Sequence, residues 1–199
     1  MMKSAWYDEN ILPKQMVKGA DGTLGWPRLE DSGHFKYLKE AISICEGNTL
    51  MDLGCGAGEV GRVYSEFDYI GYDLPHIIEK VAKKVNPHLK YDSFDAYETD
   101  FQFIKGVDIV LSNSFITELT NCTGILLKII EKVDKYIVIH RQKFSENEEM
   151  KQYKTYGGLG TTECKISEKD FNESIQGSFD VIYSASYDGM KTMTLKKTN

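Results

Sequence analysis

Residues 48–62, NTLMDLGCGAGEVGR, decide the fold of this chain. The apolar run Thr49-Leu50-Met51 has the character of a β-strand and leads into Asp52. Three glycines then occupy alternate positions: Gly54, Gly56 and Gly58. Apolar residues follow at helical spacing: Val60, Val63, Tyr64 and Phe67. The stretch therefore predicts a strand, a tight turn and a helix, a unit that presents backbone N–H groups to a ligand. Glycine suits the turn because a Cβ would hold the ligand away from the backbone.

Two cofactor classes use such a turn. Gly56-x-Gly58-x-x-Gly61 satisfies the dinucleotide fingerprint GxGxxG. From Gly54 onward, the string hydrophobic-Asp-Leu-Gly-Cys-Gly-Ala-Gly resembles motif I of the class I S-adenosylmethionine-dependent methyltransferases. Asp52 favours the second interpretation, because a carboxylate suits the cationic amino group of S-adenosylmethionine and repels a pyrophosphate. A glycine-rich turn that binds nothing is the structural alternative. The resemblance implies that a first set of residues binds the cofactor: Asp52, Gly54, Cys55, Gly56 and Gly58.

Later motifs extend the resemblance. A second strand, 69–73, ends in Asp73, 21 residues after Asp52, where either cofactor class binds a ribose; Asp73 could instead cap the helix that follows. The pair Asp95-Ala96 resembles the step that contacts adenine in these methyltransferases. The strand 107–113 runs into residues 114–119, which resemble motif IV, the floor of the active site. The resemblance thus adds four cofactor-binding candidates beyond Asp73: Leu74, Asp95, Ala96 and Asn113.

The order of elements predicts the fold class. Strands and amphipathic helices alternate from Thr49 to His140, which predicts a doubly wound α/β fold. Two β runs flank Asp188-Gly189 and predict a hairpin near the C-terminus. We therefore expect a mostly parallel, Rossmann-like sheet of about seven strands with a C-terminal antiparallel hairpin. Ser32 is the predicted N-cap of a preceding helix that ends at Gly47.

Two segments fall outside this pattern and divide the chain. Residues 1–31 form a predicted N-terminal arm or lid, and residues 32–199 form the methyltransferase domain with an insertion loop at 141–166. Aromatic and polar side chains in or near these segments could shape an acceptor pocket: Trp26, Arg28, His34, Tyr153 and Tyr156. Aromatic rings offer a large contact area with few rotatable bonds to immobilise.

Composition narrows the class of protein. Hydrophobic residues make up 41 % and the net charge is −6, values ordinary for a globular domain. Nucleic acid is a disfavoured partner, because the chain lacks a dense basic cluster and no Asn-Pro-Pro-Tyr follows the fourth strand. No apolar run is long enough to span a membrane and the N-terminus lacks a signal-peptide core. Four scattered cysteines without a CxxC pair predict neither a metal site nor a disulfide framework, which favours the cytoplasm.

The sequence therefore predicts a methyltransferase that uses S-adenosylmethionine, releases S-adenosylhomocysteine, and methylates oxygen or nitrogen of a small-molecule acceptor. His140, at the end of the fifth strand, is the first candidate for the catalytic base, although a histidine there could merely pack. Glu118 and His34 are weaker candidates. A nicotinamide-dependent oxidoreductase and a catalytically idle cofactor-binding subunit remain alternatives. The acceptor and the oligomeric state stay open.

Overall fold

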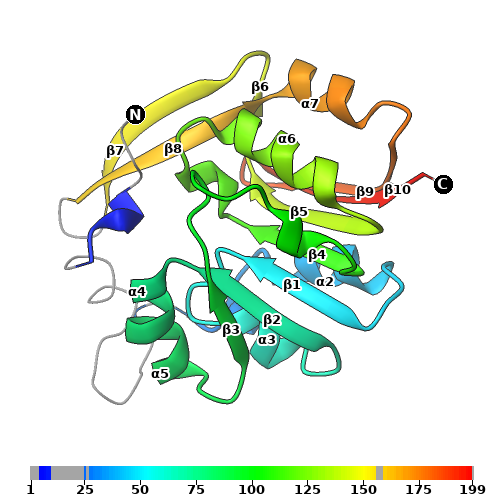
Figure 1. The fold of residues 1–199 in the computed structure, drawn as a ribbon. Helices are drawn as coiled ribbons and strands as arrows, with labels where there is room; N and C mark the ends of the chain where they lie inside the picture. Colours follow the sequence, from blue (N-terminus) through cyan, green and yellow to red (C-terminus); the bar gives the residue numbers. More distant parts are fainter. Residues whose placement is uncertain (1–4, 10–24, 26, 156–158, 199) are drawn as a thin grey trace.

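A computed structural model describes residues 5–9, 25, 27–155 and 159–198 (Figure 1). The central sheet has seven strands in the order β3-β2-β1-β4-β5-β10-β9. Five of them are parallel: β1 (Thr49–Leu53), β2 (Asp68–Asp73), β3 (Lys90–Ser93), β4 (Ile109–Asn113) and β5 (Tyr136–Gln142). The hairpin of β9 (Phe179–Tyr187) and β10 (Met190–Lys197) joins β5 antiparallel. The predicted fold class is confirmed.

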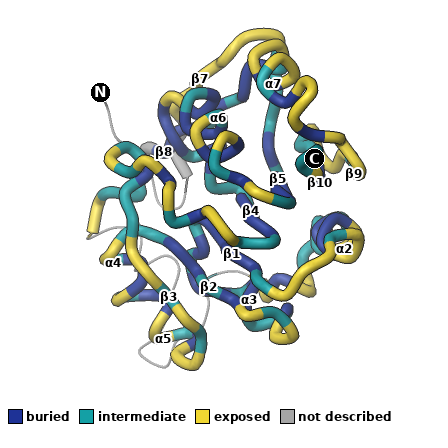
Figure 2. Tube along the Cα trace, turned by 45° about the vertical axis from the view of Figure 1, so that its right-hand side comes forward, coloured by how far each residue is buried: buried dark blue, intermediate teal, exposed yellow. Residues whose placement is uncertain are grey.

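Helices cover both faces of this sheet. They are α2 (Phe35–Ser43), α3 (Glu59–Val63), α4 (Pro75–Ile77), α5 (Lys83–Val85), α6 (Cys122–Lys132) and α7 (Glu168–Ile175), with the π-helical segment Ile78–Ala82 joining α4 to α5. Side chains alternate along β1, so Leu50 packs against α2 and α3 while Met51 packs against α6. Figure 2 shows the resulting burial: β1, β4 and β5 are largely buried, and β9 is exposed. Across the described ranges, no helix combines the length and apolar character that crossing a membrane requires.

The helix that precedes β1 begins later and ends earlier than predicted. Ser32 is not its N-cap, because α2 begins at Phe35 and His34 precedes it. Ser32 instead donates its hydroxyl to the carbonyl of Leu29, which closes the short 3₁₀ turn Leu29–Asp31. The helix ends at Ser43, not at Gly47. The N-cap prediction failed because a second hydrogen-bonding partner, in the preceding turn, was available to the same hydroxyl.

Residues 141–166 are not a loop. They contain β6 (Phe144–Ser145), β7 (Glu149–Thr155) and most of β8 (Leu159–Ser167), which form a second sheet in the order β6-β8-β7. Cys164 and Ile166 of β8 are fully buried in the core that also contains α6. The sequence did not predict these strands because polar residues alternate with the apolar ones in them. This alternation arises because one face of β8 packs on the core.

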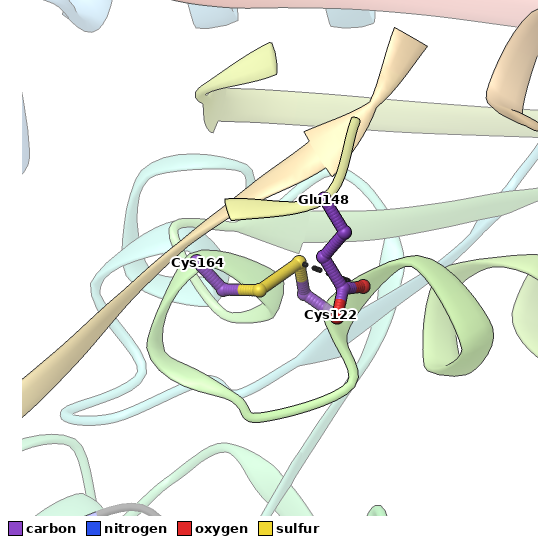
Figure 3. A group of neighbouring side chains, drawn as sticks. All are labelled: Cys122, Glu148 and Cys164. Carbon is purple, nitrogen blue, oxygen red and sulfur yellow. Dashed lines mark hydrogen bonds between the residues drawn. A yellow bond between two sulfur atoms is a disulfide. The ribbon is translucent and has the colours of Figure 1, made fainter. Parts of the chain in front are cut away.

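The prediction of no disulfide is wrong. Cys122, the first residue of α6, is bonded to Cys164 of β8, with 6.1 Å between the Cα atoms (Figure 3). Glu148 lies beside the pair and its carboxylate accepts the Thr123 N–H at 2.8 Å. The ligand atoms of Cys122, Glu148 and Cys164 lie within 4.8 Å of one another, a spacing that would suit a metal ion. Because the two sulfurs are bonded to each other, neither is a thiolate ligand here. Sequence spacing gave no sign of this pair, since 42 positions separate the cysteines.

Candidate functional site

A cavity of about 640 Å³ opens where the parallel strands end. The turn after β1 contributes Gly54 and Gly56, and the end of β2 contributes Asp73. The segment after β4 adds residues from Asn113 to Leu119. The remaining lining residues come from elsewhere in the chain: Trp6, Tyr7, Pro27, Leu29, Ser32, His34, Glu59, Val60, Phe94, Ala96, Arg141 and Thr161. Ligands of open α/β sheets bind at this edge, so the cavity is the candidate active site.

Three positions of the turn after β1 require glycine. Gly54, Gly56 and Gly58 have φ of 72°, 54° and 74°, in the left-handed region. A Cβ at Gly54 would lie 2.6 Å from the Phe115 ring, and one at Gly58 would lie 2.3 Å from the Tyr91 hydroxyl. Gly54 and Gly56 line the cavity, whereas Gly58 lies outside its lining and precedes α3. The turn thus brings bare backbone to the cavity wall.

Asp73 is held in place by the same turn. Its carboxylate accepts the Gly56 N–H at 2.8 Å and the Leu74 N–H at 2.7 Å. Burial raises the pKa of Asp73 to about 6, and these two backbone hydrogen bonds oppose the rise. Asp73 and Leu74 both line the cavity, as does Cys55. The carboxylate is therefore oriented by backbone groups and still faces the site.

Asp52 does not face the cavity. Its side chain is 1 % exposed and accepts a hydrogen bond of 3.1 Å from the Tyr69 hydroxyl of the neighbouring strand. Burial raises the pKa of Asp52 to about 7. Asp52 is not among the residues that line the cavity, so the contact with a cationic ligand group expected of it is not available in this structure.

Asp95 and Arg28 also lie outside the cavity lining. The Tyr7 hydroxyl donates to the Asp95 carboxylate, which also accepts the Tyr97 N–H at 2.9 Å. Its neighbour Ala96 does line the cavity. Arg28 forms a salt bridge of 2.6 Å with Glu59 and is nearly half exposed. The structure thus gives Arg28 an ion-pairing partner at the rim, where the sequence predicted an acceptor contact.

Of the predicted histidines, His34 lines the cavity and His140 does not. His140 is 1 % exposed, so the direct contact with an acceptor that a catalytic base requires is absent. Instead, His34 Nδ1 lies 3.0 Å from His140 Nε2, and His140 Nδ1 lies 2.8 Å from the Thr192 hydroxyl. Burial lowers the pKa of His34 to about 4 and that of His140 to about 2, with the charge of Arg141 adding to both shifts. Both imidazoles are therefore uncharged at neutral pH.

Glu118 is the second candidate for the catalytic base that lines the cavity. Burial raises its pKa to about 7. Hydrogen bonding by Trp6 and the charge of Arg141 oppose this rise, while the charge of Glu163 adds to it. A carboxyl group with a pKa near neutrality can both accept and release a proton there.

Several cavity residues were not predicted. Trp6 and Tyr7 come from the N-terminal segment, which the sequence predicted as an arm over this edge without naming these residues as ligand contacts. Phe115 lies two residues after the end of β4, and Arg141 lies near the end of β5. Because the sequence located both strands, the positions of these residues could have been inferred. Thr161 gave no signal, because β8 was expected to be loop. Trp26 and Tyr156 lie outside the described residues, and Tyr153 is described only as backbone in β7.

Comparisons with known proteins concern the fold. Neither the protein-family models nor the curated proteins searched match the sequence. Among solved structures, an S-adenosylmethionine-dependent methyltransferase from Mesorhizobium loti aligns with a TM-score of 0.63 and 11 % identity, over 85 % of this chain and all (100 %) of its own. CalS10, an amino pentose methyltransferase from Micromonospora echinaspora, gives 0.60 and 12 % over 86 % and 94 %. The glycopeptide N-methyltransferase MtfA gives 0.59 and 11 % over 84 % and 95 %. The fold is that of the class I methyltransferases, as the sequence predicted.

Proposed function

We propose that this protein is an S-adenosylmethionine-dependent methyltransferase that acts on oxygen or nitrogen of a small molecule. The observation that carries the proposal is the convergence of the glycine turn and the oriented carboxylate of Asp73 on one cavity. The fold supports it, because CalS10 and MtfA were solved with S-adenosylmethionine bound. Their names specify an amino pentose and a glycopeptide, which favours a small-molecule acceptor here.

The residues present fit the cofactor. Asp73 is placed to accept hydrogen bonds from a ribose diol, since backbone N–H groups fix its orientation. The turn at Gly54 and Gly56 exposes backbone at the wall, and Ala96 and Leu74 supply apolar contact for a purine ring. S-adenosylmethionine, when bound, supplies a methyl group already activated by the sulfonium. The protein must then mainly align the acceptor, which is worth up to ~7–11 kcal/mol when the geometry is good.

Two groups on the cavity wall could take the acceptor's proton, Glu118 and His34. Proton transfer to such a group contributes about 10²–10⁴-fold to the rate. His140 orients the His34 ring, because the hydrogen bond of 3.0 Å between His34 Nδ1 and His140 Nε2 leaves Nε2 of His34 for the cavity. We therefore propose that His140 is a positioning residue and not the base.

The dinucleotide alternative rests on Gly61, the third glycine of the fingerprint. A Cβ there would lie 2.5 Å from the Tyr69 ring, so Gly61 is required for packing α3 onto β2. Close helix-to-strand packing is also the role of the third glycine in dinucleotide-binding folds. This observation keeps a nicotinamide-dependent enzyme as the second candidate, and an idle cofactor-binding subunit would share the same cavity.

Thermal-shift measurements with S-adenosylhomocysteine, NAD(H) and NADP(H) separate these candidates. A ligand at 100 times its Kd adds ~2.7 kcal/mol to the free energy of unfolding. We expect S-adenosylhomocysteine alone to raise the melting temperature of the wild type, and less so in Asp73→Ala. Stabilisation by a dinucleotide without any by S-adenosylhomocysteine would reject the proposal. Binding of S-adenosylhomocysteine without transfer to any acceptor tested would favour the idle subunit.

A further inference from the structure

Three buried oxygen atoms of cavity-lining side chains have no hydrogen-bond partner among the described residues. One belongs to the Thr161 hydroxyl, which can donate, and the two acceptors are Oδ1 of Asn113 and Oε2 of Glu118. Both residues line the cavity and both come from the segment that begins where β4 ends. An unsatisfied buried acceptor costs about 1–3 kcal/mol, so such atoms at a cavity wall indicate where a ligand supplies donors.

The carboxylates of the cavity wall differ in how their charge is compensated. Within the part of the chain that the structure describes, Glu59 pairs with Arg28 and Arg62, and Asp73 accepts two backbone N–H groups. Glu118 forms no salt bridge in that part. Its surroundings include the charges of Arg141 and Glu163, which oppose each other. Burial without an ion pair explains why its pKa rises to about 7.

We propose that Glu118 and Asn113 form a subsite for an ammonium group, and that the acceptor of this methyltransferase is an amine. This rests on the proposed function and assigns its substrate class. An ammonium group brings several N–H donors and a positive charge, so it can satisfy both oxygens and keep Glu118 ionised. A hydroxyl group brings a single donor and no charge, and it would leave one of the two acceptors unsatisfied.

The same carboxylate prepares the amine for reaction. An ammonium nitrogen has no lone pair, so it must first lose a proton, and Glu118 is placed to take it. The nitrogen lone pair then forms the C–N bond to the methyl carbon as the C–S bond breaks, and that electron pair stays on sulfur. The product is a methylated ammonium group and a neutral thioether, and the proton taken by Glu118 returns to solvent.

The amino-acid end of S-adenosylmethionine also carries an ammonium group. We assign the subsite to the acceptor because the groups that act on Glu118 come from segments other than the glycine turn and β2. They are Trp6 near the N-terminus, Arg141 on β5, and Thr161 and Glu163 on β8. Of the cofactor-binding candidates, Gly54, Gly56 and Asp73 lie at the ends of β1 and β2, whereas Asn113 lies at the end of β4 and is reassigned by this proposal to the acceptor.

The experiment compares matched amines and alcohols on the full-length protein saturated with S-adenosylhomocysteine. The probes are D-glucosamine against D-glucose and ethanolamine against ethylene glycol, with binding followed by ligand-observed NMR. With S-adenosylmethionine in place of the product, methyl transfer to each probe is measured as a second readout. We expect the wild type to favour each amine by about tenfold or more, the effect of one charge-assisted hydrogen bond. Glu118→Gln should lose this preference and still bind S-adenosylhomocysteine with wild-type affinity.

Glu163→Gln is the matched control, because it removes a nearby carboxylate that pairs with Lys143 and lies outside the cavity lining. It should keep the amine preference. Absence of any preference in the wild type, or its survival in Glu118→Gln, overturns the proposal. Loss of S-adenosylhomocysteine affinity in Glu118→Gln also overturns it, and assigns the subsite to the cofactor's own amino group. If the wild type fails to bind S-adenosylhomocysteine at all, the proposed function fails instead.

Discussion

Breaking the disulfide between Cys122 and Cys164 should destabilise the protein by an amount that follows from the length of the closed loop. The bond joins positions 42 residues apart. A loop of that length in the unfolded chain loses entropy worth about 4 kcal/mol at 25 °C when it is cross-linked. For a protein of this size, such a change corresponds to a fall in melting temperature of about 8–16 °C. Denaturation of the wild type with and without reductant measures the effect directly.

The double variant Cys122→Ala and Cys164→Ala should reproduce the reduced wild type and should no longer respond to reductant. Cys45→Ala is the control, because Cys45 is a free, partly buried thiol. A wild type whose unfolding midpoint does not change on reduction would refute the loop argument. Mass spectrometry of an unreduced digest that found both thiols free would refute the bond itself. Because the Thr117 hydroxyl donates to the Cys164 carbonyl at 3.3 Å, reduction should also loosen β8 beside the cavity.

Four further predictions concern the site. Asp73→Ala should weaken S-adenosylhomocysteine binding by about 1–3 kcal/mol in titration calorimetry, because it removes hydrogen bonds to the ribose; unchanged affinity would reject its placement. Once an acceptor is identified, Glu118→Gln should lower kcat by about 10²-fold or more without changing cofactor affinity, and His34→Ala and His140→Asn should lower it less; a larger loss in His34→Ala than in Glu118→Gln would move the role of base to His34. Because burial raises the pKa of Glu118 from 4.5 to about 7, ionisation of Glu118 should lower the free energy of unfolding as pH rises through that window, by on the order of 3 kcal/mol. Asp52 and Asp73 shift in the same direction, so the test is the difference in urea-unfolding free energy between wild type and Glu118→Gln, which should fall by that amount over the window; parallel profiles would contradict this. Deleting residues 1–28 should leave a folded domain that binds S-adenosylhomocysteine and fails to bind the acceptor, and full activity of the truncated protein would sink the lid hypothesis.

The cofactor half of the site could be predicted because its determinants are local in sequence. A strand, three glycines with φ near 50–75° and a following helix specify one turn, and the register of β1 with β2 brings Asp73 beside it. The orientation of Asp52 could not be predicted in the same way. Successive side chains of a strand point to opposite faces, and only the packing of Tyr69 on the neighbouring strand shows that Asp52 is enclosed there.

The acceptor half depends on contacts between segments far apart in the chain. His34 and His140 are 106 positions apart, and their hydrogen bond exists because α2 packs beside β5 and β10. Glu118 was located from sequence, but its raised pKa comes from burial and from the charge of Glu163, which outweigh the opposing effects of Trp6 and Arg141. None of these partners could be named from a motif.

The cofactor half and the acceptor half of the cavity should differ in how readily their residues can change. The turn at Gly54 and the carboxylate of Asp73 are fixed by backbone geometry, so they tolerate little variation and suit a constant ligand. The wall formed by β8 is held to the core through the disulfide and packs beside the segment that carries Glu118. Side chains on β8 can therefore change without disturbing the turn. Substitutions at Thr161 should alter which acceptor binds and leave the affinity for S-adenosylhomocysteine unchanged. The reason is that Thr161 lies on β8, whereas the glycine turn and Asp73 lie at the ends of β1 and β2.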